Sequence, residues 1–346
     1  MRIGVLTGGG DAPGLNAAIR AVVLRASALG HEVLGITDGW AGLLGEHEPS
    51  PLMPRQVVGI LGDGGTILGT SRTDPRKDDK SRRAVLESIR RFRIDALVAI
   101  GGNDTLGVAQ WLDEQKVKVV GVPKTVDNDL AETEFCIGFD TAITVVSEAL
   151  DRLRTTASAH HRVVVVEAMG RDTGWVAAFG GLAGGADLIL VPEIPVTSAQ
   201  IVRTMKRRRA SGDPDILVVV SEAVEIEGLE ALTASDRDAF GHVRLDQRAI
   251  GAVLARHIEQ HTGIEARQVV LGHLQRGGSP TAIDRLRATR FGNAAVDLVD
   301  AGRSGELPVQ RAGRIEVATL ADAVREIRRL SPDYIELVRR FAGVVD

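Results

Sequence analysis

The chain has 346 residues, a length that favours two domains over one. Its 42 basic and 46 acidic side chains give a formal net charge of −4. We therefore expect neither nucleic acid nor a membrane surface as a partner, since both usually require a basic face. The single Cys136 excludes an internal disulfide, the start lacks a secretory signal, and no apolar run predicts a membrane span, so a cytoplasmic protein is expected.

Short apolar runs alternate with longer amphipathic stretches. In chain order the runs are RIGVLT (2–7), HEVLGIT (31–37), DALVAI (95–100), VKVVGV (117–122), RVVVVEA (162–168), DLILVP (187–192) and DILVVV (215–220). The amphipathic stretch LNAAIRAVVLRASALG (15–30) predicts a helix after the first run. Apolar strands followed by helices indicate parallel sheets covered on both faces, so the sequence predicts an α/β protein. The polar stretch at 224–246 predicts a surface insertion.

Four clusters rich in glycine or polar residues follow apolar runs. They are GGGDAPGLNA (8–17), GDGGTILGTSR (62–72), GGNDTLG (101–107) and PKTVDND (123–129). The carboxyl ends of parallel strands are where α/β proteins bind ligands, because helix N-termini there offer unpaired N–H groups. The first cluster fits neither the dinucleotide fingerprint nor the GxxxxGK[ST] loop. It predicts a phosphate cradle with Gly10 near the helix start and Asp11 as the helix cap.

PKTVDND concentrates charge at the end of an apolar strand. In an extended segment Asp127 and Asp129 would share a face, and two such carboxylates can hold a metal or divide base and metal roles. The spacing alone also fits a capped turn before a helix. Lys124 is equally open to two interpretations, a solvated surface charge or a ligand of a phosphoryl oxygen.

Over essentially its whole length the sequence resembles the 6-phosphofructokinase family. The four clusters, GFDTA (138–142), MGRDTGW (169–175), VPE (191–193), SEA (221–223) and LGHLQRGGSP (271–280) occur in the family's order. The resemblance implies two doubly wound, mostly parallel-sheet α/β domains with the active site in the cleft between them. It implies a phosphoryl-donor domain over 1–139 plus 275–325 and a fructose 6-phosphate domain over 140–274 plus 326–346.

The resemblance also implies roles for individual residues. Asp127 matches the general base that accepts the proton of the sugar 1-hydroxyl, and Thr125 matches its positioning neighbour. Asp129 matches the carboxylate that binds Mg²⁺, and Arg171 matches a cation that stabilises the transferring group. Catalytic matches are Thr125, Lys124, Asp127 and Arg171, and donor-binding matches are Gly10, Arg72, Asp104 and Lys124.

A second set matches the family's sugar-phosphate site. Its members are Thr125, Asp127, Arg162, Met169, Gly170, Arg171, Glu222, Arg267, His273 and Arg276. In the family, the residues that match Arg162 and Arg267 come from a neighbouring subunit. The resemblance therefore implies a homodimer or homotetramer with shared sites.

Two positions indicate the phosphoryl donor. Family members that use pyrophosphate typically carry Asp and Lys where this chain has Asp104 and Lys124, whereas ATP users typically carry glycine there. An aspartate at position 104 would repel a nucleotide α-phosphate, and Lys124 would attract pyrophosphate oxygens. Asn103 departs from the family, which usually has an acid at this metal position, and Asn can bind a metal only through its neutral amide oxygen.

Pyrophosphate is therefore the predicted donor, fructose 6-phosphate the acceptor and Mg²⁺ the cofactor. Three alternatives stay open on the sequence. The first is an ATP-dependent phosphofructokinase. The second is a NAD or diacylglycerol kinase, which GGNDT suggests but PKTVDND and LGHLQRGGSP oppose. The third is a catalytically silent sugar-phosphate sensor, which only Asn103 favours.

Overall fold

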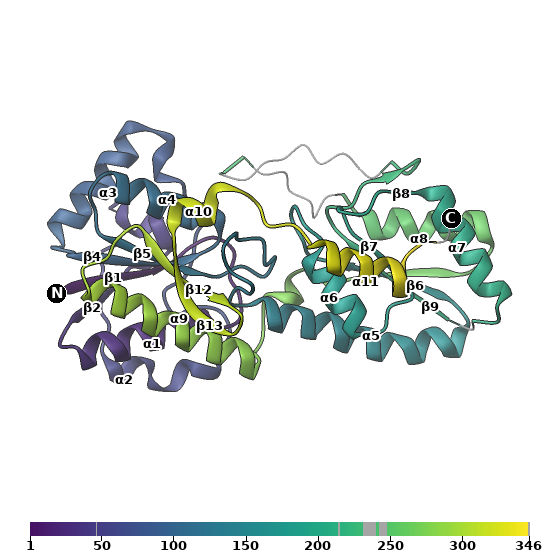
Figure 1. The fold of residues 1–346 in the computed structure, drawn as a ribbon, viewed down its shortest axis with the longest axis horizontal. Coiled ribbons are helices and arrows are strands. Elements are labelled where there is room, and N and C mark those ends of the chain that lie inside the picture. The colour runs from purple at the N-terminus through teal and green to yellow at the C-terminus, as the bar shows by residue number, and fades with distance from the viewer. Residues whose placement is uncertain (46, 214, 231–239, 242–247, 345–346) are drawn as a thin grey trace. The chain divides into compact units, whose positions relative to one another are not determined.

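The computed structural model describes the chain except residues 46, 214, 231–239, 242–247 and 345–346 (Figure 1). The chain divides into two compact units. The first is built mainly from Met1–Thr141 and Arg276–Ile327, and the second mainly from Ala142–Arg237, Val243–Gln275 and Arg328–Asp346. The chain thus leaves the first unit after Thr141, and its main return to that unit runs from Arg276 to Ile327.

The first unit contains a seven-stranded sheet in the order β13-β12-β5-β4-β1-β2-β3. Its strands are β1 (Arg2–Thr7), β2 (Glu32–Gly35), β3 (Ser50–Pro51), β4 (Ala96–Gly101), β5 (Val119–Pro123), β12 (Glu306–Arg311) and β13 (Arg314–Thr319). The five strands from β12 to β2 run parallel, and β3 and β13 join the two edges antiparallel. The centre of this sheet therefore brings the carboxyl ends of β1, β4 and β5 to one edge.

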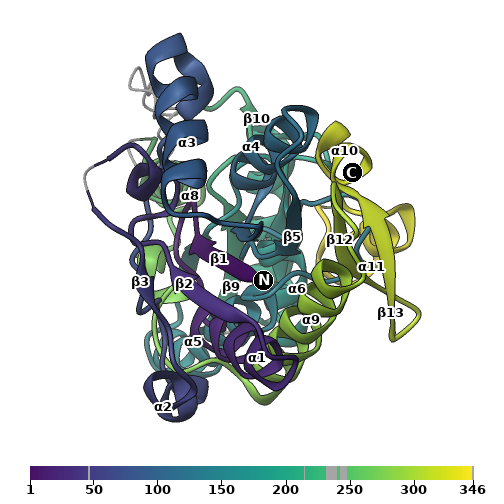
Figure 2. The same cartoon turned by 90° about the vertical axis from the view of Figure 1, so that its left-hand side faces the viewer.

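Helices cover both faces of this sheet (Figures 1 and 2). The helices are α1 (Leu15–Ala28), α2 (Pro54–Val57), α3 (Asp79–Arg91), α4 (Asn103–Glu114), α9 (Ala282–Asp300) and α10 (Leu320–Arg325). Successive side chains of a strand point to opposite faces of the sheet, so the strands contribute to two hydrophobic cores. Ile3 and Val5 of β1 pack with the apolar side chains of α1 and α9, whereas Leu6 packs with those of α3 and α4.

The second unit contains a four-stranded parallel sheet in the order β11-β6-β9-β7. Its strands are β6 (Val163–Ala168), β7 (Leu188–Leu190), β9 (Ile216–Ser221) and β11 (Ala266–Val270), and β8 (Val196–Thr197) pairs with β10 (Ile226–Glu227). Its helices are α5 (Phe139–His160), α6 (Trp175–Ala183), α7 (Ser198–Ala210), α8 (Ile250–Thr262) and α11 (Pro332–Ala342). Helix α5 begins in the first unit and continues into the second.

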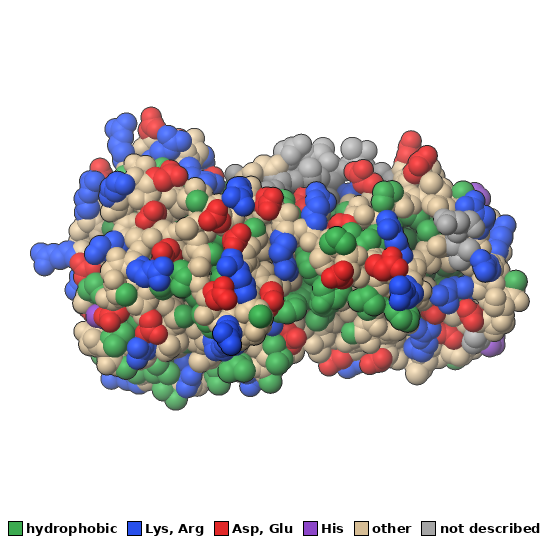
Figure 3. Space-filling view, in the orientation of Figure 1, with side chains coloured by type: hydrophobic (Ala, Val, Ile, Leu, Met, Phe, Trp, Pro, Cys, Tyr) green, Lys and Arg blue, Asp and Glu red, His purple; other side chains and the backbone are tan. Residues whose placement is uncertain are grey.

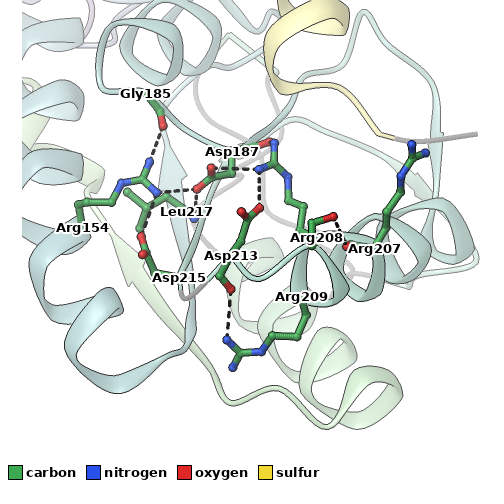
Figure 4. A network of polar contacts seen from close by, with 10 residues as sticks. Arg154, Gly185, Asp187, Arg207, Arg208, Arg209, Asp213, Asp215 and Leu217 are labelled. Atoms are coloured by element: carbon green, nitrogen blue, oxygen red, sulfur yellow. Dashed lines mark hydrogen bonds and ion pairs between the residues drawn. The ribbon is translucent and has the colours of Figure 1, made fainter.

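An ionic network holds the amino ends of β7 and β9 (Figure 4). The Asp187 carboxylate accepts hydrogen bonds from Arg154 (2.7 Å), Arg208 (3.2 Å) and the backbone N–H of Leu217 (2.8 Å). Asp215 accepts a second bond from Arg154 at 3.0 Å. These cations are thus paired with carboxylates of their own unit, as partly buried charges usually are.

The predicted α/β class with mostly parallel sheets is confirmed. Every apolar run named above overlaps a strand, and 15–30 contains α1. Most of the predicted surface insertion at 224–246 lies outside the described residues. Within the described part of the chain, no helix is long and apolar enough to cross a membrane. On the face seen in Figure 3, basic and acidic side chains are interspersed.

Candidate active site

The four glycine-rich or polar clusters meet in the first unit. The backbone N–H of Gly8 donates to Ile100 O at 3.0 Å, and that of Lys124 donates to Gly101 O at 3.0 Å. The cluster at 62–72 joins them, because Gly9 N donates to Ser71 O at 3.0 Å and Thr70 Oγ1 donates to Gly9 O at 2.7 Å. Parallel register of β1, β4 and β5 is the reason these loops share one edge.

Lys124 is buried in this cluster rather than solvated. Its Nζ donates to the carbonyl oxygens of Gly8 (3.0 Å) and Gly10 (2.5 Å), and the residue is 2% exposed. Burial, and then repulsion from Arg276, lowers the pKa of Lys124 from 10.5 to about 7. Asp11, Asp127 and Cys136 oppose this shift only in part. Of the two interpretations of Lys124, the surface charge is therefore wrong.

Arg276 lies against the first cluster. Its Nη1 donates to Asp11 O at 3.0 Å, and the residue is 8% exposed. A Cβ on Gly10 would stand 2.7 Å from that Nη1, so any other residue at this position would displace the guanidinium. Lys124 and Arg276 form no ion pair with any of the described residues. Two buried cations side by side, bound to carbonyl oxygens, make a site for an anion.

The prediction that Asp11 caps the first helix is wrong. Helix α1 begins at Leu15, its N-cap is Gly14 with φ of 104°, and no side chain bonds there. A left-handed N-cap suits glycine, because the Cβ of any other residue is sterically strained in that conformation. Asp11 instead contributes its backbone carbonyl to Arg276.

The two acidic residues of PKTVDND flank a left-handed residue instead of lying on a regular extended strand. Asn128 has φ of 53° and is fully buried. Its Oδ1 accepts a hydrogen bond from Cys136 N (2.9 Å), and its Nδ2 donates to Glu134 O (3.1 Å). The side chain thus fixes the turn between Asp127 and Asp129. Sequence analysis missed Asn128, although a lone Asn between two acids is typical of a left-handed turn.

Asp127 and Asp129 are both largely buried, at 9% and 7% exposure. The backbone N–H of Asp127 donates to Thr125 Oγ1 at 3.1 Å, which links the predicted base to its predicted neighbour. Asp129 Oδ2 accepts a hydrogen bond from Asn103 Nδ2 at 3.2 Å. Asn103 is the first residue of α4, so the predicted metal residues of two loops are adjacent.

Two predicted donor residues lie at the border of this cluster. Asp104 is half-buried in the first turn of α4, where the helix dipole favours a carboxylate. Arg72 is exposed at the end of the 62–72 cluster. Among the described residues, no group of three or more His, Cys, Asp and Glu side chains could hold a metal by itself.

Another group of predicted residues lies at the carboxyl ends of β6 and β9 in the second unit. Gly170 N donates to Glu222 Oε1 at 3.3 Å, and Met169 N donates to Gln275 Oε1 at 3.3 Å. Arg171 follows directly and is half-buried. Gln275, which precedes Arg276 in the LQRGG motif, is a further residue that sequence analysis missed.

Arg162 and Arg267 lie toward the other end of that sheet. Arg162 directly precedes β6, and Arg267 pairs in register with Val164, the second residue of β6. Six residues of strand span about 20 Å at ~3.3 Å per residue, so these arginines are far from Met169 within one chain. Both approach Glu265, at 3.8 Å and 2.6 Å. His273 is exposed in the 3₁₀ turn Gly272–Gln275.

Comparisons with known proteins identify the family of the chain. The family profile described as phosphofructokinase matches residues 2–299. A pyrophosphate–fructose 6-phosphate 1-phosphotransferase of Amycolatopsis methanolica is 50% identical over 99% of this chain and 100% of its own. ATP-dependent 6-phosphofructokinase 3 of Streptomyces coelicolor is 45% identical over 96% of this chain and 97% of its own. The crystal structure of a pyrophosphate-dependent phosphofructokinase from Marinobacter aquaeolei has the same fold, with a TM-score of 0.81 at 23% identity over 99% of this chain and 92% of its own.

Proposed function

Since the chain belongs to the phosphofructokinase family, we propose that it moves a phosphoryl group from inorganic pyrophosphate to the 1-hydroxyl of D-fructose 6-phosphate. The products are fructose 1,6-bisphosphate and phosphate. The reaction is a reversible step of glycolysis, and its charged substrates belong to the cytoplasm. The relative named for this reaction matches at higher identity than the relative named for ATP.

One observation carries the choice of an anionic donor. Lys124 and Arg276 are buried beside Gly10, and their described hydrogen bonds go to backbone carbonyls. Burial, and then repulsion from Arg276, lowers the pKa of Lys124, so an anion bound here would stabilise the charged form of the side chain. Pyrophosphate is such an anion. The contact with Asp11 also supports a role for Arg276 on the phosphoryl side, in addition to the predicted role at the sugar.

Asp104 supports pyrophosphate over ATP. Its carboxylate occupies the first turn of α4, where a glycine would leave N–H groups open to a nucleotide phosphate. A fixed negative charge at that position repels an additional phosphate and takes up its space.

Catalysis then depends on positioning and on charge. Asp127 accepts the proton of the 1-hydroxyl, and the hydroxyl oxygen forms its bond to phosphorus while the bridging P–O bond of pyrophosphate breaks. Lys124 neutralises the leaving phosphate, and Arg171 stabilises the transferring group. The Asn128 turn holds Asp127 on its neighbour Thr125.

The carboxylate of Asp129 and the amide of Asn103 fit a role for Mg²⁺. Magnesium in such enzymes is held by one or two protein oxygens together with substrate phosphates, so no larger protein cluster is needed. When bound, the ion would neutralise charge on the phosphoryl oxygens. Asp129 would be its main protein ligand, and Asn103, whose Nδ2 contacts that carboxylate, would orient it.

The sugar phosphate would be bound by Met169, Gly170 and Glu222 of the second unit. Arg162 and Arg267 lie about one strand length away from Met169. This separation supports the proposal that they serve the site of a neighbouring copy. The protein would accordingly be a homodimer or homotetramer.

The test is a comparison of initial rates with pyrophosphate and with ATP, each with Mg²⁺ and fructose 6-phosphate. We expect pyrophosphate to be the better donor. An ATP-dependent enzyme, the second candidate that the relatives' names favour, would reverse the ratio, and a silent sensor would bind fructose 6-phosphate without turnover.

The same assay tests the base. Asp127→Asn keeps the shape of the side chain and removes its basicity, so the maximal rate should fall ~10²- to 10⁴-fold while fructose 6-phosphate binding, followed by calorimetry, is retained. Asp151→Asn, the same change at an exposed position of α5, is the matched control. Near-normal turnover of Asp127→Asn would exclude the assigned role.

A further inference from the structure

The segment 327–330 passes from the first unit to the second, and its residues contact a loop of their own unit in each case. Ile327, the last residue of the first unit, forms an isolated antiparallel bridge with Leu130. Leu130 directly follows Asp129, so this bridge anchors the end of the PKTVDNDL loop. The next residue, Arg328, already belongs to the second unit.

In the second unit, Arg328 and Arg329 contact the loop between β6 and α6. Trp175 Nε1 donates to Arg328 O at 2.9 Å, and the Arg328 guanidinium stacks 4.3 Å from the centre of the Trp175 ring. Arg329 Nη1 reaches Asp172 O at 3.4 Å. Trp175 also packs edge-on against Tyr334 of α11, with ring centroids 5.9 Å apart.

Glu193 connects the same two segments through one carboxylate. It accepts hydrogen bonds from Gly174 N (3.0 Å) and from Leu330 N (3.2 Å). Gly174 is the N-cap of α6 and has no side chain of its own to cap the helix. Glu193 therefore binds the free N–H of the N-cap residue from another loop, at the helix end where the dipole favours its negative charge.

Little free space surrounds this junction. A Cβ on Gly174 would meet Val191 Cβ at 2.3 Å and Glu193 Oε2 at 2.8 Å. Thr173 is fully buried, and Leu330 is 4% exposed. The VPE motif thus packs directly under the end of the MGRDTGW loop, which explains the glycine there.

The start of that loop carries the residues assigned to the sugar phosphate. Gly170 is bound to Glu222, and Met169 to Gln275. Glu193, Arg328 and Arg329 hold the other end, at residues 172–175. Arg171 lies between the two anchors, so its position depends on both.

We propose that Glu193 and residues 328–330 position the MGRDTGW loop for the sugar phosphate. Glu193 and Trp175 act as positioning residues through Gly170 and Arg171, without contacting the substrate. The inference rests on the proposed function. It predicts a selective effect, because the anchored loop is assigned to fructose 6-phosphate and not to the donor.

The test variant is Glu193→Gln, which removes the charge and leaves one acceptor oxygen for two N–H groups. A hydrogen bond to a charged group typically contributes a factor of about ten or more to the equilibrium that depends on it. Here that equilibrium is the binding of fructose 6-phosphate to the positioned loop. We expect the KM for fructose 6-phosphate to rise about tenfold, and the KM for pyrophosphate to stay within about twofold. Glu193→Asp, which keeps the charge, should recover part of the loss.

Trp175→Phe is the second variant, since it removes the bond to Arg328 O but keeps an aromatic ring. It should shift the same KM in the same direction. The matched control is Glu336→Gln, an identical change in an exposed ion pair of α11. Calorimetry with fructose 6-phosphate gives a reading independent of turnover, and circular dichroism establishes that each variant is folded.

Two outcomes would overturn the inference. One is a folded Glu193→Gln protein with unchanged affinity for fructose 6-phosphate. The other is an equal rise in the KM values for fructose 6-phosphate and pyrophosphate, which would mean a general loss of structure. If Glu193→Gln does not fold, the same two outcomes are judged on Trp175→Phe. Failure of the proposed function looks different, because the wild-type protein itself would then show no turnover with pyrophosphate.

Discussion

The amide nitrogen of Asn103 donates to the carboxylate Oδ2 of Asp129 over 3.2 Å. In Asn103→Asp, two carboxylates would stand at this distance, and their repulsion would be relieved by a divalent cation. We expect the Mg²⁺ concentration for half-maximal rate to fall, and the free energy of unfolding without Mg²⁺ to fall as well. Rates over a magnesium titration and urea unfolding measure the two effects.

The chain offers a close control for this change. Asn293 Nδ2 also donates to an aspartate, Asp297, at 3.2 Å, but in an exposed position on α9. Asn293→Asp should leave the magnesium dependence of the rate unchanged. If Asn103→Asp behaves like this control, Asn103 does not lie at the metal.

Lys124 should take up a proton when pyrophosphate binds. Its pKa is lowered to about 7, so at about pH 8 the unliganded side chain is mostly neutral, and a bound anion favours the charged form. Calorimetry in two buffers of different ionisation enthalpy measures the uptake. Lys124→Met should lose it, whereas Lys118→Met, the same change at an exposed position, should keep it.

The same pKa affects stability. Between pH 7 and 10.5 the unfolded chain keeps the Lys124 proton that the folded chain has lost. Because the unfolded state binds more protons there, the contribution of Lys124 to the free energy of unfolding rises with pH across this window. We expect the free energy of unfolding, measured with urea at several pH values, to rise more steeply with pH in the wild type than in Lys124→Met. If the two plots against pH are parallel, the pKa of Lys124 is not lowered in the folded chain.

Asp104→Gly should change the choice of donor. The substitution removes the negative charge from the first turn of α4 and opens the helix N-terminus to a nucleotide phosphate. We expect the ratio of ATP to pyrophosphate rates to increase, with pyrophosphate used less well. Glu114→Gly, at the exposed end of the same helix, controls for the added flexibility. A ratio that stays at the wild-type value would exclude Asp104 as the determinant.

Asn128 should affect the maximal rate and the free energy of unfolding through both its backbone conformation and its side-chain hydrogen bonds. Asn128→Gly keeps access to φ of 53° but loses the bonds to Cys136 and Glu134, whereas Asn128→Ala loses the bonds and also pays about 1 to 2 kcal/mol for the left-handed conformation. We expect the maximal rate and the free energy of unfolding to fall in both, and further in the alanine variant. Equal effects of the two substitutions would show that the conformation is not limiting.

Assembly should be required for sugar-phosphate binding. If Arg162 and Arg267 serve a neighbouring copy, dilution to monomer should remove two phosphate ligands and weaken fructose 6-phosphate binding. Light scattering and activity should therefore decline together on dilution. A fully active monomer would contradict the shared site.

The sequence alone was sufficient for the fold class and for the four loops of the first unit. Runs such as RVVVVEA are apolar on both faces, and only a covered parallel sheet accommodates them, so class and loop positions follow from local pattern. It did not reveal the antiparallel edge of β12 and β13, since neither strand is an apolar run and the residues of β13 are all exposed or half-buried. Nor did it reveal that Gly14, and not Asp11, is the N-cap of α1.

Burial and partners were decided by the tertiary structure. The sequence PKT is also compatible with a solvated lysine. Lys124 is buried and has a lowered pKa because the fold places Gly8, Gly10 and Arg276 around it. Glu193 likewise acquires its two backbone donors from segments far apart in the chain. Local pattern specifies which groups can ionise and where strands end, but desolvation and long-range hydrogen bonds depend on which loops the sheet register brings together.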